Sequence, residues 1–90
     1  MNKAEFVTFM SDKYNCSKAE ATRALDMVTE AVTKALGSGK DVALVGFGSF
    51  YVQSRKAREG RNPKTGAKMH IAAYKQPAFR AGKKLKDACN

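Results

Sequence analysis

The sequence predicts an α+β fold in which a helical hairpin precedes a β-sheet, a protruding two-stranded ribbon and a short final helix. Apolar residues recur at helical spacing up to Leu36, and from Val42 onward they follow the period of two that is typical of strands. Residues 1–52 carry as many acidic as basic side chains, so residues 53–90 carry the whole formal net charge of +9. A chain of 90 residues is expected to form one domain.

The first helix is predicted to begin at a capping box, with Asn2 as the N-cap and Glu5 three positions later. Phe6, Phe9 and Met10 follow at helical spacing. They are therefore expected to form the buried side of this helix.

A second, longer helix is predicted after a break at residues 14–16. Ser17 and Glu20 form its capping box, and Gly37-Ser38-Gly39 is expected to end it at the C-cap. Its continuous apolar stripe consists of Ala21, Leu25, Val28, Val32 and Leu36. This stripe is wider than packing against one short helix and a small sheet requires. In addition, a body of about 70 residues rarely has a hydrophobic core that is sufficient for stability. The sequence therefore predicts a homodimer with a shared core.

A β-hairpin is predicted next. Val42 and Leu44 lie before a turn near Gly46–Gly48, and Phe50 and Val52 lie after it. The second strand is expected to continue into the basic segment.

The basic segment, residues 53–68, contains no large apolar side chain, so it cannot bury enough surface to form a core. Residues 62–66 have the composition of a reverse turn, and Met69, Ile71 and Ala73 return at period two. We therefore expect a two-stranded ribbon of roughly 30 Å that projects from the body.

Both faces of this ribbon are predicted to be basic. Arg55 and Arg61 would share one face and Lys56 and Arg58 the other, provided that no bulge intervenes. After the ribbon, Pro77 suits an edge strand, and a short basic helix is expected near the C-terminus.

The charge points to a polyanionic partner, with nucleic acid favoured over an acidic membrane surface. No basic amphipathic helix with bulky apolar anchors supports membrane binding, and no apolar run is long enough to span a bilayer. The lone His70 has no nucleophile or carboxylate constellation around it, so no enzyme and no cofactor are predicted. Cys16 and Cys89 are interpreted as buried, reduced packing residues without a metal.

Three motifs resemble the HU and integration host factor family over the whole chain: Gly46-Phe47-Gly48-Ser49-Phe50, Gly60-Arg61-Asn62-Pro63-Lys64-Thr65-Gly66, and Pro77-Ala78-Phe79 with Ala81-Gly82-Lys83. The length is more similar to HU. The resemblance implies an intertwined homodimer with a helical base (1–37), a β saddle (40–79) with an arm at about 53–75, and a C-terminal helix (80–90). It also implies a nucleoid-associated, cytoplasmic protein that bends double-stranded DNA, preferring bent, nicked or gapped forms.

The resemblance assigns roles to two sets of residues. Arms that follow the minor groove imply that Pro63 inserts at a base step. The expected DNA-binding residues are Arg55, Lys56, Arg58, Arg61, Asn62, Pro63, Lys64, Thr65, Lys68, Lys75, Lys3, Arg80, Lys83 and Lys86. The expected dimer core is Phe6, Leu25, Val28, Val32, Leu36, Leu44, Phe47, Phe50 and Phe79.

Several alternatives stay open. One is a site-specific bender similar to integration host factor, which would require a heterodimer and readout of DNA shape. Another is an RNA-binding or ribosome-associated module, although residues 53–68 contain no aromatic stacking platform. Pro63 could act as a turn former only, and Lys83, Lys84 and Lys86 could simply complement a helix dipole.

Overall fold

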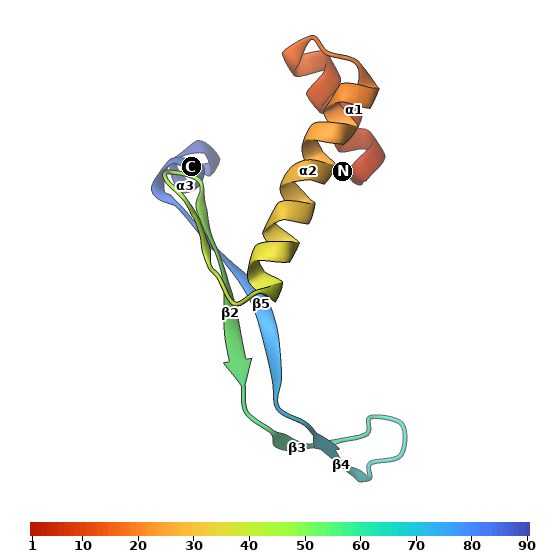
Figure 1. Cartoon of the computed structure of the whole chain (residues 1–90). Helices are drawn as coiled ribbons and strands as arrows, with labels where there is room; N and C mark the ends of the chain where they lie inside the picture. Colours follow the sequence, from red (N-terminus) through yellow and green to blue (C-terminus); the bar gives the residue numbers. More distant parts are fainter. The chain divides into compact units, whose positions relative to one another are not determined.

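The computed structural model describes residues 1–90, and its backbone separates into two compact units, Met1–Ala35 and Leu36–Asn90. Two helices come first, and five strands and a third helix follow (Figure 1), which confirms the predicted α+β fold. The elements are α1 (Lys3–Tyr14), α2 (Lys18–Gly37), β1 (Val42–Leu44), β2 (Gly48–Arg55), β3 (Arg58–Arg61), β4 (Lys68–Ile71), β5 (Tyr74–Ala81) and α3 (Lys83–Cys89). No helix is both long and apolar enough to cross a membrane.

Both predicted N-caps are present in the first unit. The backbone N–H of Glu5 donates to Oδ1 of Asn2 at 2.9 Å, and that of Glu20 donates to Oγ of Ser17 at 3.0 Å. Each bond satisfies a donor that the first turn of a helix leaves without a partner. Asn15 then ends α1 in the left-handed conformation, with φ of 51°, so the predicted break between the two helices is confirmed.

The buried side of α1 differs from the prediction. Val7 and Ser11 are its buried residues, whereas Phe6 and Phe9 are 39% and 50% exposed and Met10 is half-buried. The rings of Phe6 and Phe9 stack on each other with centroids 6.4 Å apart. Only the narrow Val7 side is covered within one chain, so most of the aromatic surface of α1 stays open to a partner.

The apolar stripe of α2 is likewise left largely uncovered by the rest of the chain. Ala21 is its only buried residue, and Val28 remains 55% exposed. A stripe of apolar residues that reaches water over several turns is unusual for a helix of a self-sufficient domain.

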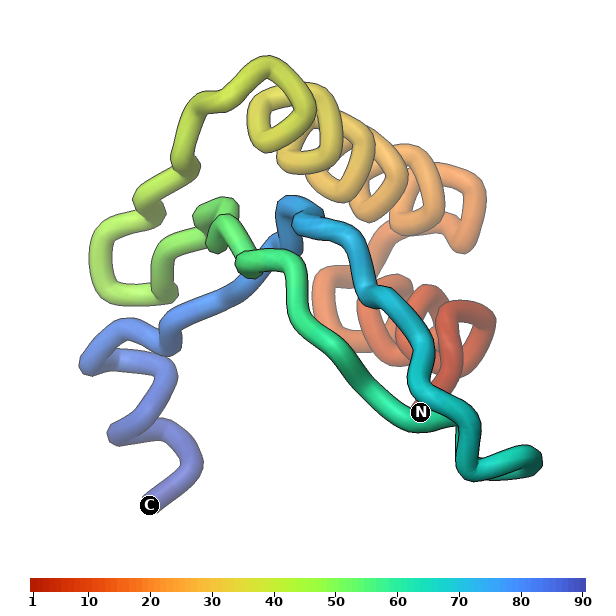
Figure 2. The backbone as a smooth tube through the Cα atoms, turned by 90° about the horizontal axis from the view of Figure 1, so that it is seen from below, coloured from red at the N-terminus to blue at the C-terminus, as the bar shows by residue number.

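The second unit contains an antiparallel sheet with the strand order β1-β2-β5. Leu44 pairs with Gly48 across the first hairpin, whose turn contains Gly46 at φ of 84°, so the predicted turn is confirmed. β2 and β5 pair along their whole length, from Gly48 opposite Ala81 to Arg55 opposite Tyr74. They lie side by side as a long ribbon (Figures 1 and 2).

The ribbon of β2 and β5 has one apolar face. The ring of Phe79 lies 4.7 Å from that of Phe50 and 5.6 Å from that of Phe47, measured between centroids. Gly48 is buried beside this cluster, and a Cβ atom there would lie 2.5 Å from Cζ of Phe79. Pro77 lies within β5, an edge strand of the sheet, as the sequence predicted.

β3 and β4 form a separate two-stranded sheet beyond the end of this ribbon. Residues 56–57 and 72–73 have no strand structure, and the chain turns there before β3 and after β4 (Figure 1). The expected ribbon arm is therefore present, but in two pieces. Side chains alternate between the two faces only within a continuous strand, and the strand is interrupted between Arg55 and Arg61. The prediction that these two residues share a face therefore loses its basis.

Candidate nucleic-acid interface

The turn at the tip of the arm holds Pro63 on the surface. The amide N–H of Lys64 donates to Oδ1 of Asn62 at 2.9 Å, and Gly66 donates to the carbonyl oxygen of Asn62 at 2.7 Å. Gly66 itself has a φ of 71°, a conformation that glycine adopts without a steric penalty. Pro63 is exposed between these bonded residues, so its rigid ring is presented at the end of the arm.

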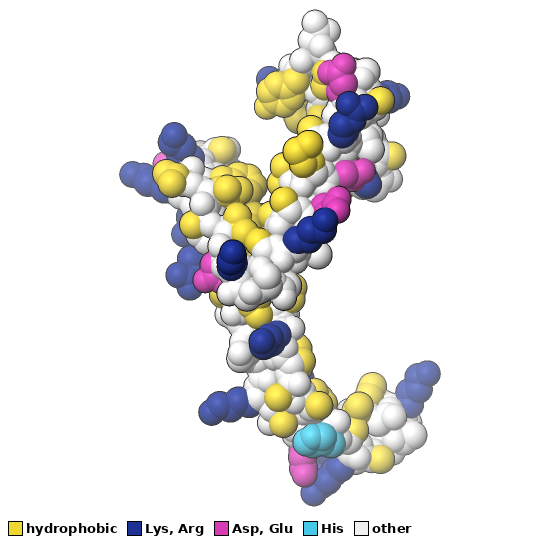
Figure 3. Space-filling view, viewed as in Figure 1, with side chains coloured by type: hydrophobic (Ala, Val, Ile, Leu, Met, Phe, Trp, Pro, Cys, Tyr) yellow, Lys and Arg dark blue, Asp and Glu magenta, His cyan; other side chains and the backbone are white.

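The cations of the arm are exposed and are not paired with carboxylates. The ion pairs of the structure are Lys3–Asp26 and Lys34–Glu30, both within α1 and α2. In the space-filling view, dark blue side chains project along the ribbon and its tip, with little magenta among them (Figure 3). Charge without internal partners is available to an external polyanion.

One face of the arm tip places like charges together. Arg61 lies directly opposite Lys68, and two positions along the same register Glu59 lies opposite His70. Side chains two residues apart share a face of a strand, so these four lie on one face. Like charges directly opposite each other destabilise a sheet in water, and an anion bound between them removes that cost.

The ribbon of β2 and β5 carries a polar face that sequence reasoning did not assign. The guanidinium of Arg80 lies 5.7 Å from the ring centroid of Tyr51, whose hydroxyl accepts a hydrogen bond from Nε2 of Gln53 at 3.4 Å. Nε of Arg55 donates to Oε1 of Gln76 at 3.2 Å further along. The signal was the alternation within 49–53, in which Ser49, Tyr51 and Gln53 are separated by the apolar Phe50 and Val52.

The predicted DNA-binding residues fall into separate groups. One group lies along the arm: Arg55, Lys56, Arg58, Arg61, Asn62, Pro63, Lys64, Thr65 and Lys68. Arg80 joins the polar face of the ribbon, whereas Lys75, an odd number of positions away, lies on the face of Phe79. Lys83 and Lys86 belong to α3, which follows the opposite end of β5, and Lys3 belongs to the other unit.

The lysines of α3 include two that a helix dipole does not explain. α3 begins at Lys83, so Lys83 and Lys84 occupy its first turn, where there is no acidic residue. The helix N-terminus carries partial positive charge and favours anions, so cations there are unfavourable within the chain. Dipole complementation is therefore the wrong explanation for these two lysines and remains suitable only for Lys86 in the last turn.

The interpretation of the cysteines as buried is also wrong in part. Cys89 is exposed at the end of α3, where one short helix offers no cover, and Cys16 is half-buried. No group of three or more His, Cys, Asp or Glu side chains could hold a metal ion.

Comparison with known proteins agrees with this geometry. The family model described as bacterial DNA-binding protein matches residues 1–90, so the chain belongs to that family. The DNA-binding protein HU-beta of Serratia marcescens is 58% identical over 90 residues, and the DNA-binding protein HU of Rickettsia conorii is 52% identical over 99; each alignment covers 100% of both chains.

The solved structures include HU with DNA. The Anabaena HU–DNA cocrystal structure has a TM-score of 0.88 and 47% sequence identity, over 99% of this chain and 97% of that chain. HU from Thermotoga maritima has a TM-score of 0.69 and 29% identity over the full length of both chains. Both structural alignments therefore run over the helices, the sheet and the arm of this chain.

Proposed function

We propose that this protein is a nucleoid-associated, architectural DNA-binding protein, and that it bends DNA as a homodimer without catalysing a reaction. The observation that carries the proposal is the arm: a two-stranded hairpin with no core, whose exposed cations have no carboxylate partner. Phosphates of a duplex would neutralise these cations, and the counterions released would favour binding with little dependence on sequence.

Within this function, the arms would follow the minor groove and Pro63 would insert at a base step. Its exposed ring, fixed between two hydrogen bonds to Asn62, is suited to that role because it is rigid and needs no desolvation of an N–H group. Unstacking one step costs a few kcal/mol, which contacts along the bent duplex would offset. DNA that is already nicked, gapped or bent avoids part of this cost and is therefore the preferred form.

The homodimer is supported by apolar surface that one chain leaves open. Among the residues of the proposed shared core, several large ones are about 40–55% exposed: Phe6, Val28, Leu44, Phe47 and Phe79. Leu25, Val32, Leu36 and Phe50 are half-buried. A two-fold partner would cover this surface and would place two arms symmetrically on one duplex. The helical base would be residues 1–37, the saddle 40–79 and the C-terminal helix 80–90.

The decisive test is a mobility shift on intact and nicked duplexes of one sequence, with the mass of the free protein measured by light scattering. We expect tighter binding to the nicked duplex and a mass of two chains. A monomer, or equal affinity for both duplexes, would contradict the proposal. A structured RNA of equal length serves as the competitor, and preferential binding to it would favour an RNA-binding module instead.

A further inference from the structure

A hollow lies where the arm joins the ribbon, at the break between β2 and β3. It has a volume of about 490 Å³ and is lined by Arg55, Lys56, Ala57, Arg58, Tyr74 and Gln76. Three of the six lining side chains are cations and none is a carboxylate. A concave site with this charge favours an anion.

Arg55 is held in this hollow by a neutral partner. Its Nε donates to Oε1 of Gln76 at 3.2 Å, and its backbone lies directly opposite Tyr74 in the register of β2 and β5. The bond engages one edge of the guanidinium and leaves the Nη groups for another acceptor. Because Gln76 is an amide, it orients Arg55 without neutralising it, as a carboxylate there would.

We propose that Gln76 is a positioning residue for DNA binding: it holds Arg55, already an expected DNA contact, so that the guanidinium in this hollow is presented to one phosphodiester of the backbone. The inference rests on the proposed DNA binding, and it adds a defined orientation for one phosphate contact at the root of the arm. A guanidinium group whose orientation is fixed can donate hydrogen bonds from its Nη groups to two oxygens of one phosphate. Lys56 and Arg58 add positive charge beside it.

The test is a double-mutant cycle on a nicked duplex with Arg55→Gln and Gln76→Leu. Arg55→Gln is expected to weaken binding roughly threefold to tenfold and to lower the slope of log Kd against log salt by about 0.9 for each arm engaged. Gln76→Leu leaves the charge of Arg55 in place, so it is expected to weaken binding by a smaller factor and to change the slope less. The double variant is expected to bind no more weakly than Arg55→Gln, because Gln76 acts only through Arg55.

Gln53→Leu is the matched control. Gln53 lies directly opposite Gln76, on the same face, but it donates to Tyr51 and has no bond to Arg55. Its effect is expected to be additive with Arg55→Gln. Thermal unfolding of all variants identifies any loss that comes from the fold.

Gln76→Glu separates positioning for a phosphate from a structural role. Glutamate still accepts the bond from Arg55, so a structural role would be preserved, whereas a carboxylate beside a bound phosphate repels the ligand. We expect Gln76→Glu to bind more weakly than Gln76→Leu. The inference would be contradicted if Gln76→Glu bound DNA with wild-type affinity, or if the losses in the double-mutant cycle were additive. Neither result would contradict DNA binding itself.

Failure of DNA binding has a different signature. If the wild-type protein binds no duplex, the proposed function is wrong. The positioning of Arg55 for a phosphate is then tested separately, by titration with inorganic phosphate. The NMR signal of the Arg55 Nε–H group is then expected to shift in the wild type and not in Gln76→Glu. No shift in either protein would overturn this positioning as well.

Discussion

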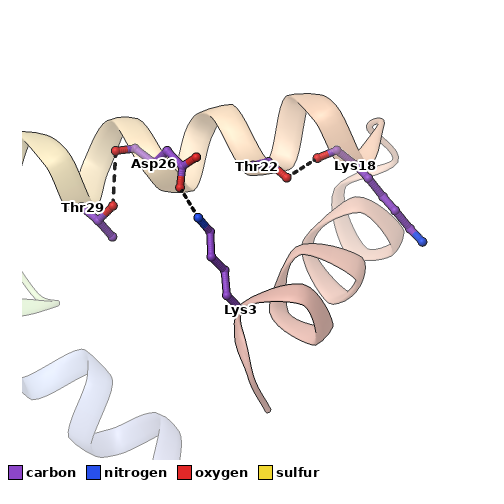
Figure 4. A network of polar contacts seen from close by, with 5 residues as sticks. All are labelled: Lys3, Lys18, Thr22, Asp26 and Thr29. Atoms are coloured by element: carbon purple, nitrogen blue, oxygen red, sulfur yellow. Dashed lines mark hydrogen bonds and ion pairs between the residues drawn. The ribbon is translucent and has the colours of Figure 1, made fainter.

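Nζ of Lys3 lies 2.8 Å from Oδ1 of Asp26, so an ion pair joins the first turn of α1 to the middle of α2 (Figure 4). Lys3 is thereby the only cation among the expected DNA contacts that a carboxylate already engages. Both side chains are about half exposed or more, at 64% and 49%, so water and salt screen their attraction.

This pair is expected to contribute little to stability. A double-mutant cycle with Lys3→Met and Asp26→Asn should give a coupling free energy below about 1 kcal/mol in urea unfolding, and the coupling should shrink in 1 M salt. The Lys34–Glu30 pair within α2 is the control and should behave similarly. A coupling of several kcal/mol that survives high salt would contradict a screened pair.

Pro63→Ala is expected to reduce bending more than it reduces affinity for DNA that is already kinked. Removing the ring takes away the group that we propose unstacks a base step, so affinity for intact duplex should fall roughly tenfold. Affinity for DNA that is already kinked should change less than about threefold, because the unstacking cost is absent there. Bending is measured by energy transfer between duplex ends.

The control for Pro63→Ala is Thr65→Ala in the same turn. Its Oγ1 accepts a bond from the N–H of Ala67 at 3.3 Å, so this variant perturbs the turn without removing the ring. Equal losses of affinity on straight and kinked DNA for Pro63→Ala would leave the proline as a turn former only.

Arg58→Gln and Arg61→Gln are expected to lower the salt dependence of binding. Each removed phosphate contact reduces the slope of log Kd against log salt by about 0.9 for every arm on the duplex. Lys13→Gln, a neutralisation on α1 outside the expected interface, is the control and should leave the slope unchanged. A wild-type slope near zero would exclude phosphate tracking altogether.

Gly48→Ala is expected to destabilise the second unit. The added Cβ would meet Cζ of Phe79 at 2.5 Å and the carbonyl oxygen of Arg80 at 2.6 Å, so the aromatic cluster must move. We expect a loss of about 1–3 kcal/mol in denaturant unfolding, as is typical of overpacking. Gly37→Ala, with nothing within 4 Å at the end of α2, should be neutral or stabilising. Equal stability of the two variants would be inconsistent with this packing.

Local signals in the sequence predicted most of the fold. The caps at Asn2 and Ser17, the turn near Gly46 and the tip around Asn62 depend on residues within three or four positions of each other, and all are present. Such short-range bonds depend on side-chain type more than on tertiary context.

Burial and the shape of the arm were harder to predict. Periodicity identified the face of Phe6 and Phe9 as apolar. It could not distinguish side chains that are buried within one chain from side chains that only a partner chain would bury. The interruption at 56–57 has no glycine or proline to mark it, so alternation was extended through it. The pairing of Gln76 with Arg55, 21 residues apart, follows from the register of two strands and has no local signal.

Pro77 in β5 has a consequence for crowded solutions. A proline is accommodated in an edge strand where its nitrogen points away from the sheet, so the outer rim of β5 lacks a donor at that position. A strand from a neighbouring molecule could not complete its ladder there. We therefore expect the open edge of this sheet to resist strand addition by neighbouring molecules, and so to resist assembly into fibrils, at high protein concentration.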